Sequence, residues 1–330
     1  MAGSGNGAVF MALVGNAILT VLKVVAFVIS GSGAMMSEAV HSAADTANQG
    51  LLFMGMRKSL KPADSRFHYG YGADRYVFAL MSAMGIFILG CGVTVYHGVH
   101  SLMHPPELSI SWIIFAVLGA AVLVDGYVFL AAIKEVNSGR GKKSFSKFIR
   151  TSTDPTLIAV LFEDFVATLG AIIAAIGIAL AHYTGNPVYD SATLIIIGAM
   201  LGVMAIWLGW RNRELILGPA IPEDVQEEVL AFLLEQPSIE AVRQFRTRVV
   251  AADTFRIAAE IDYDGIYLGR KHGDWLREQA KDIDSDEGWN ELAGLFGEKL
   301  MDELGVEVDD VEAKLVAKFP EIRHIDMEAD

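Results

Sequence analysis

Six long apolar segments fill the first two thirds of the 330-residue chain and limit what it can fold into. A helix that crosses the hydrocarbon core of a bilayer needs about 20 mostly apolar residues. All six segments reach that length, and short connections containing Gly and Pro separate several of them. The sequence therefore predicts six membrane-spanning helices. They cover residues 8–30, 37–56, 76–102, 111–133, 155–183 and 191–210.

Charge is divided unevenly along the chain. The formal net charge is −14, yet residues 1–218 hold 12 acidic and 14 basic side chains, whereas residues 219–330 hold 28 acidic and 12 basic ones. We therefore expect a transmembrane domain at 1–214 and an acidic cytoplasmic domain at 215–330. The acidic balance argues against a nucleic-acid partner. The single cysteine, Cys91, excludes a site built from several thiolates.

Basic residues occur only in alternate connections between the apolar segments. The first, third and fifth connections contain no Lys or Arg. The positive-inside rule therefore predicts that both termini are cytoplasmic. No signal or transit peptide is recognisable, which favours the inner membrane of a bacterium. The basic residues of the other connections are Arg57, Lys58, Lys61, Arg66, Arg75, Lys134, Arg140, Lys142, Lys143, Lys147, Arg150, Arg211 and Arg213.

The acidic tail has the pattern of a small α/β domain. A helix is predicted from Pro222 to about Leu234, and alternating apolar residues predict strands at 242–250 and 255–261. A helical region at about 286–319 follows, with a break expected near Gly305, and a last strand is predicted at 322–327. This order predicts a sheet covered by helices.

Charged side chains inside the apolar segments carry the functional signal, because an ionisable group at bilayer depth is costly. His41 and Asp45 lie four residues apart, so they share a helix face about 6 Å apart along the axis. An imidazole nitrogen and a carboxylate oxygen are ligands of a divalent cation. Glu163 and Asp164 are adjacent in the fifth segment, so at most one of them faces a shared site squarely. The pattern favours metal or proton handling over a purely structural pair.

Other ionisable residues are interpreted differently. Lys23 is expected to reach the outer interface, and Asp125, placed toward the cytoplasmic side of the fourth segment, to have a structural role. Asp64 and His68 in the second connection have a spacing that suits a weak surface metal site.

Several motifs in order resemble the cation diffusion facilitators, and in particular their zinc transporter 9 branch. The resemblance extends over essentially the whole chain. Family members are homodimeric transporters in the lipid bilayer that exchange zinc or a related divalent cation for protons. The motifs are SEAVHSAAD at 37–45, HYGYGADRY at 68–76, GCGVTVYHG at 90–98, LFED at 161–164, GNPVYD at 185–190 and EIRHID at 321–326.

The resemblance implies a zinc efflux transporter with six spans and a ferredoxin-like cytoplasmic tail, working by alternating access with protons as the counter-ion. It implies metal ligands at His41, Asp45 and Asp164, with Glu163 or water completing the set. The family's fifth-span histidine is replaced by Val160, which makes the ligands richer in oxygen and raises manganese or another hard cation as an alternative substrate.

The sequence leaves two further points open, which are the long segment in the tail and an alternative function to transport. The segment 265–303 is longer than the usual tail requires. A non-transporting, metal-responsive membrane scaffold is the alternative function, because the missing histidine could leave a site that binds without turnover. An enzyme is not expected, since no histidine is followed directly by glutamate, as a zinc peptidase helix requires.

Overall fold

The structure is a computed structural model that describes residues 4–30, 33–105, 112–141 and 143–330. The chain divides into two compact units, Met1–Leu217 and Gly218–Asp330, and each unit has a hydrophobic core of its own.

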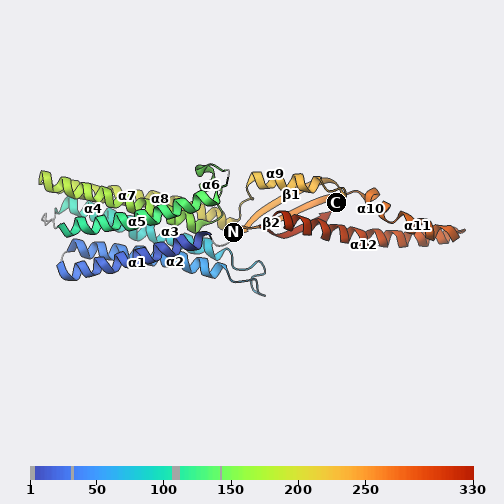
Figure 1. Ribbon diagram of the computed structural model, residues 1–330, viewed down its shortest axis with the longest axis horizontal. Helices are drawn as coiled ribbons and strands as arrows, with labels where there is room; N and C mark the ends of the chain where they lie inside the picture. The colour runs from blue at the N-terminus through green and yellow to red at the C-terminus, as the bar shows by residue number, and fades with distance from the viewer. Residues whose placement is uncertain (1–3, 31–32, 106–111, 142) are drawn as a thin grey trace. The chain divides into compact units, whose positions relative to one another are not determined.

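Long helices make up the first unit (Figure 1). The third to fifth of its elements follow one another without interruption and form one helical segment. That segment contains a π-helix, in which one extra residue per turn shifts the positions of the side chains. The elements are α1 (Ser4–Ser30), α2 (Gly33–Ser59), α3 (Asp74–Gly85), the π-helix η1 (Ile86–Val93), α4 (Thr94–Met103), α5 (Trp112–Gly139), α6 (Phe145–Thr151), α7 (Pro155–Thr184) and α8 (Val188–Leu217).

Four of the six predicted spans are long and apolar enough to cross a membrane in the described part of the chain. They are the α3–α4 segment and most or all of α5, α7 and α8. Helices α1 and α2 have 27 residues each, about 40 Å, which is also the length of a span. However, α2 carries several ionisable residues, and some side chains of α1 lie outside the described residues. The first unit is thus a helical membrane domain with four clearly apolar helices.

Glycines allow the α3–α4 segment to approach α8 closely. A Cβ added at Gly98 would lie 2.7 Å from Ile195 Cγ1 and 3.1 Å from the Ser191 carbonyl oxygen. From α8, a Cβ at Gly202 would in turn lie 2.8 Å from the Sγ atom of Cys91 in the α3–α4 segment. Cys91 therefore acts as a small packing residue, and backbone-to-backbone contact replaces side-chain interdigitation here.

A three-stranded mixed sheet and its helices form the second unit. Strand β1 (Ile239–Ala251) pairs antiparallel with β2 (Thr254–Tyr263), and β3 (Ile322–Ala329) pairs parallel with β2. Apolar residues of α9 (Glu223–Leu234) and of α12 (Asp286–Lys318) pack on one face of this sheet. Ile257 and Ile261 of β2 are fully buried at the centre of this core. The predicted helices and strands of the tail are confirmed, apart from the break at Gly305.

Helix α12 is continuous through Gly305, so the predicted break is wrong. Glycine costs a helix only about 1 kcal/mol relative to alanine, which tertiary contacts outweigh. Here the ammonium of Lys271 lies 2.9 Å from Glu303 and 2.5 Å from Glu307, bridging the turn that contains the glycine. The long segment 265–303 comprises α10 (Gly265–Lys271), α11 (Gly273–Gln279), a 3-10 turn, η2 (Ala280–Asp282), and the first half of α12.

Candidate metal-binding site

Helix α7 carries two carboxylates that are buried in the core of the membrane domain. Its start is well defined: Asp154 accepts hydrogen bonds from the backbone N–H of Thr156 and Leu157, and Pro155 occupies the first turn. Within the next three turns, nearly every side chain is buried against α2, α3, α5 or α8. Glu163 and Asp164 lie in this buried stretch, 7% and 2% exposed.

Two amides of α2 hold Glu163. Asn48 Nδ2 donates to Glu163 Oε1 at 2.9 Å, and Gln49 Nε2 donates to Oε2 at 2.7 Å. Asn48 and Gln49 are themselves buried. Both carboxylate oxygens therefore have a charge-assisted donor, which fixes the side chain and satisfies it inside the helix bundle.

Asp164 is less completely satisfied. One oxygen, Oδ2, is buried without a hydrogen-bond partner among the described residues, as are Asn48 Oδ1 and Gln49 Oε1. A buried acceptor without a donor is unusual in a folded protein and calls for an explanation such as a bound ion. The unpartnered oxygen of Asp164 is the one among them that carries a carboxylate charge, so it suits a cation.

Asp45 lies on α2 one helical turn before Gln49, and it is partly buried. Its charge acts on both Glu163 and Asp164. Helix α1 is joined to α2 at the same level, since the Thr20 hydroxyl lies 2.8 Å from the Ser42 carbonyl oxygen and 2.8 Å from the Thr46 hydroxyl. The structure thus brings Asp45, Glu163 and Asp164 into one region.

The predicted imidazole ligand falls on a position that the structure describes only in part. The backbone of residue 41 belongs to α2, but the side chain of His41 lies outside the described residues. Among the described side chains, no group of three His, Cys, Asp or Glu residues has the geometry of a closed metal site. The predicted set of His41, Asp45, Asp164 and Glu163 therefore stays a prediction. Val160, in the place of the family histidine, is fully buried.

Asp125 and Lys23 are both buried in the membrane domain. Asp125 lies near the middle of α5, is 7% exposed, and acts electrostatically on Asp164 and Glu163. Lys23 is 6% exposed, so it is buried rather than extended to an interface.

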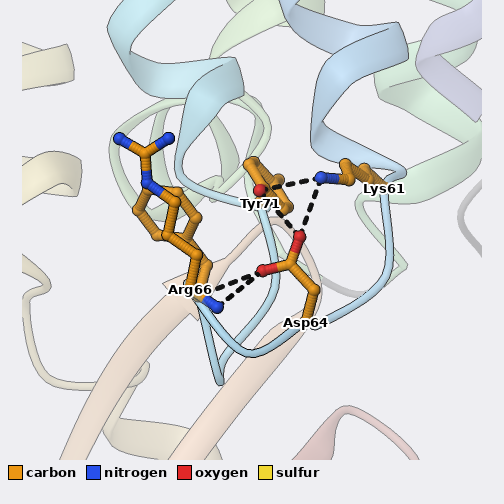
Figure 2. Close-up of polar contacts among 5 residues, drawn as sticks. Lys61, Asp64, Arg66 and Tyr71 are labelled. Carbon is orange, nitrogen blue, oxygen red and sulfur yellow. Dashed lines mark hydrogen bonds and ion pairs between the residues drawn. The ribbon is translucent and has the colours of Figure 1, made fainter.

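The connection between α2 and α3 has a compact hydrogen-bonded structure (Figure 2). Asp64 accepts hydrogen bonds from Lys61 Nζ at 2.8 Å, from the Tyr71 hydroxyl at 2.9 Å, and from the backbone N–H groups of Arg66 and Phe67. The ammonium of Lys61, followed by the Tyr71 hydroxyl, holds the pKa of the Asp64 carboxyl well below its usual range.

These contacts give Asp64 a structural role in the connection. His68 places Nε2 3.2 Å from the Ser65 carbonyl oxygen instead. The weak metal site predicted at Asp64 and His68 stays a prediction, with both oxygens of the carboxylate already engaged.

Sequence reasoning did not predict the part that three residues play in this region. Asn48 and Gln49 are uncharged and gave no signal, although a buried amide in an apolar helix is itself costly and could have been noted. Asp125 was recognised as a charge inside a span. Its relation to α7 depends on helix packing, which the sequence does not contain.

Similarity to known proteins extends over almost the whole chain. Residues 9–217 match the cation efflux transmembrane domain. The chain is 37% identical over 335 residues to the human "Proton-coupled zinc antiporter SLC30A9, mitochondrial", an alignment that covers 98% of this chain and 58% of the human protein. It is 36% identical over 336 residues to "Metal tolerance protein C4" of Arabidopsis thaliana, covering 98% and 73%.

A more distant similarity links the chain to a magnetosome protein. "Magnetosome protein MamM" of Magnetospirillum gryphiswaldense is 28% identical over 255 residues, covering 73% of this chain and 72% of that protein. The chain spans about three fifths of the length of the vertebrate relatives that it matches.

Proposed function

The chain belongs to the cation efflux family, and on that premise we propose that it carries a divalent cation across a membrane in exchange for protons. The observation that carries the proposal is the buried pair Glu163 and Asp164 on α7, within electrostatic range of Asp45 on α2. Ionisable groups inside a membrane domain mark ion pathways, because their burial is otherwise costly.

The proposed ligands are His41, Asp45 and Asp164. Glu163 supports them from α7, since its oxygens already accept hydrogen bonds from Asn48 and Gln49. Zinc is the first candidate substrate, because two of the relatives above are named for zinc transport or metal tolerance. An oxygen-rich site also suits manganese and other hard divalent cations.

Protons couple to transport through the ligands themselves. An imidazole and carboxylates must lose protons to bind a metal ion, so protonation and cation binding compete at one site. Alternating access then requires the site to open to one side with the cation and to the other with protons. An inward proton gradient drives the cation outward under this scheme.

The proposed topology has six spans, in which α1 and α2 join the four helices that are long and apolar enough in the described part of the chain. The basic connections after the second and fourth spans put both termini on the cytoplasmic side. The tail corresponds to a ferredoxin-like domain that pairs two copies of the chain in the cytoplasm. The bacterial inner membrane stays a prediction.

Flux measurements on purified protein in proteoliposomes test the proposal. We expect zinc to drive proton movement in the wild type, and His41→Ala or Asp45→Ala to abolish it while the variants still fold. Glu135→Gln, near the end of α5, is the matched control and keeps the wild-type rate. Manganese, cobalt, cadmium and iron, tested in turn, identify the preferred cation. Undiminished flux in both site variants would show that the site is wrong.

The same experiment separates transport from the scaffold alternative. Val160 in place of the family histidine motivates that alternative, since a weakened site could bind a cation without moving it. A wild-type protein that binds zinc in a titration but moves neither zinc nor protons would favour the scaffold. Flux by the purified protein alone would eliminate it.

A further inference from the structure

A groove of about 800 Å³ lies open between α6, α7 and α8 of the membrane domain. That volume is within the range of roughly 300–1,000 Å³ that is typical of ligand sites. The residues that line it are mostly apolar, and some of them are well exposed, since Val203 is 71% exposed and Phe165 42%. In a membrane-spanning domain, exposed side chains of this kind face lipid acyl chains, which are as apolar as they are.

The length of the groove is close to the thickness of one leaflet of a bilayer. Along α8 it extends from Trp207 back to Ile196, eleven residues or about 16 Å of helix. The hydrocarbon core is about 30 Å thick, so one leaflet contributes about half of that. Helix α6 lies where α7 begins and α8 ends (Figure 1), and there Arg211 of α8 donates to the Ser152 carbonyl oxygen at 3.0 Å. An acyl chain that enters beside α6 can therefore lie along the groove as far as the middle of the bilayer.

The end of the groove at α6 is basic. Arg150 is the one charged side chain among the described residues that line the groove, and Ser146, one turn earlier on α6, lines it too. Lys147 also lies one turn before Arg150, and both basic side chains are exposed. In the part of the chain that the structure describes, no carboxylate pairs with either cation. Residues 140–153 contain five basic side chains and no acidic one, so an occupant with a negative charge fits this end.

Apolar walls with a basic end match an anionic phospholipid. Its acyl chains pack on residues such as Phe165 and Val203, and its phosphate accepts hydrogen bonds from a guanidinium and a hydroxyl. Basic pockets between membrane helices at the membrane surface bind such headgroups. A second copy of the chain fits less well, because a twofold contact through this groove would bring the basic residues of both copies together.

We propose that the groove between α6, α7 and α8 binds one anionic phospholipid, with its phosphate at Arg150 and Lys147 and an acyl chain along α7 and α8. The lipid belongs to the leaflet on whose side α6 lies. It packs against Phe162 and Trp207, which line the groove with their ring centroids 4.8 Å apart. Phe162 directly precedes Glu163, so the lipid lies beside the part of α7 that carries the buried carboxylates. Binding of the lipid does not depend on which residues hold the transported cation.

Native mass spectrometry of the detergent-purified full chain tests the proposal, with phosphatidylglycerol and phosphatidylcholine of identical acyl chains as the probes. We expect the wild type to bind one phosphatidylglycerol more tightly than phosphatidylcholine. Arg150→Gln should lower the affinity for phosphatidylglycerol about fivefold, as for one basic residue at a membrane surface, and leave that for phosphatidylcholine unchanged. Arg213→Gln, the matched control, removes an exposed charge from the end of α8 outside the groove and should match the wild type.

Ala199→Phe tests the apolar part of the groove. Ala199 lines the groove and is exposed, so a phenyl ring there occupies the space of an acyl chain without entering the helix core. This variant should bind both lipids more weakly than the wild type, with an unchanged melting temperature in lipid-free detergent. Glycerol 3-phosphate, which has no acyl chain, should not displace phosphatidylglycerol from the wild type.

Four results would overturn the proposal. The wild type could bind both lipids equally, or Arg150→Gln could keep the wild-type preference. Phosphatidylglycerol binding that Ala199→Phe leaves intact would mean a headgroup contact without a groove. A change from dimer to monomer in Ala199→Phe would mean that a second copy covers the groove. If Ala199→Phe does not fold, the comparison of Arg150→Gln with Arg213→Gln decides.

Discussion

Two adjacent carboxylates on α7 have different surroundings, and the difference assigns them different roles. Glu163 is held by two amide donors from α2, whereas Asp164 keeps one buried oxygen without a partner among the described residues. Neighbouring residues on a helix point about 100° apart, so one site cannot use both in the same way. Asp164 is the better ligand, and Glu163 the better support.

Replacing each carboxylate by its amide tests this division. Asp164→Asn should reduce zinc flux in proteoliposomes more than about 100-fold, because a charged ligand is lost. Glu163→Gln should reduce it only about tenfold, as for the loss of a supporting partner. Melting temperatures of the two purified variants control for folding. Equal losses would contradict the assignment, and a larger loss for Glu163→Gln would reverse it.

At the scale of elements, the sequence predicted helices wherever composition and capping residues agree. Asp154 and Pro155 mark the start of α7, and Pro222 precedes α9, so these boundaries were readable. The π-helix η1, which lies against α8, was not predicted, because no local pattern in the sequence marks it. The contact of Asn48 with Glu163 spans 115 positions, which no local pattern encodes.

Gly305 illustrates why the break in α12 was predicted wrongly. Glycine weakens a helix locally, but ion pairs from Lys271 to Glu303 and Glu307 lie on either side of it. Local propensity is a weak preference that tertiary contacts override. Gly305 can be read from the sequence. The position of Lys271 beside Glu303 and Glu307 cannot, because it depends on how α10 packs on α12.

Gly305→Ala should therefore stabilise α12 by about 0.5–1 kcal/mol, because nothing lies within 4 Å of the added Cβ and the helix is continuous. Hydrogen exchange of α12 amides in the full chain, followed by mass spectrometry, measures the effect as slower exchange. Gly218→Ala is the contrasting variant, since Gly218 has φ 76° and its Cβ would meet the side chain of Arg248. That substitution should destabilise the tail. Faster exchange in Gly305→Ala would mean that the helix is interrupted.

For the whole molecule, the uneven charge suggests a long-range effect on uptake. Residues 219–330 carry a net charge of −16, and residues 1–218 carry +2. A negative domain raises the local concentration of divalent cations, and salt screens this attraction. The Debye length falls from about 30 Å at 0.01 M salt to about 8 Å at 0.15 M.

Raising the salt concentration over this range should slow zinc uptake from the side that bears the tail. The uptake rate at low zinc concentration is the quantity to measure in proteoliposomes, where capture of the cation limits the rate. The maximal rate at saturating zinc should change little and serves as the internal control. If the uptake rate at low zinc concentration does not change with ionic strength, the negative charge of the tail has no role in attracting the cation.

The packing of α7 on α8 changes in character along its length. Near the end of α7, a Cβ at Gly177 would overlap the side chain of Thr193, so this side chain packs directly on the backbone of α7. Fifteen residues earlier, the rings of Phe162 and Trp207 separate the same helices, with centroids 4.8 Å apart. A groove of about 800 Å³ opens beside this aromatic pair, lined by α6, α7 and α8.

If α7 tilts about its contact at Gly177, the helix acts as a lever whose pivot is that contact. The arm from Gly177 to Phe162 is about 22 Å long, so a tilt of about 10° displaces its far end by about 4 Å. Glu163 and Asp164 lie near that far end, where a small rotation produces the largest travel. A rocking motion that barely disturbs the glycine contact would therefore be enough to uncover or enclose the carboxylates.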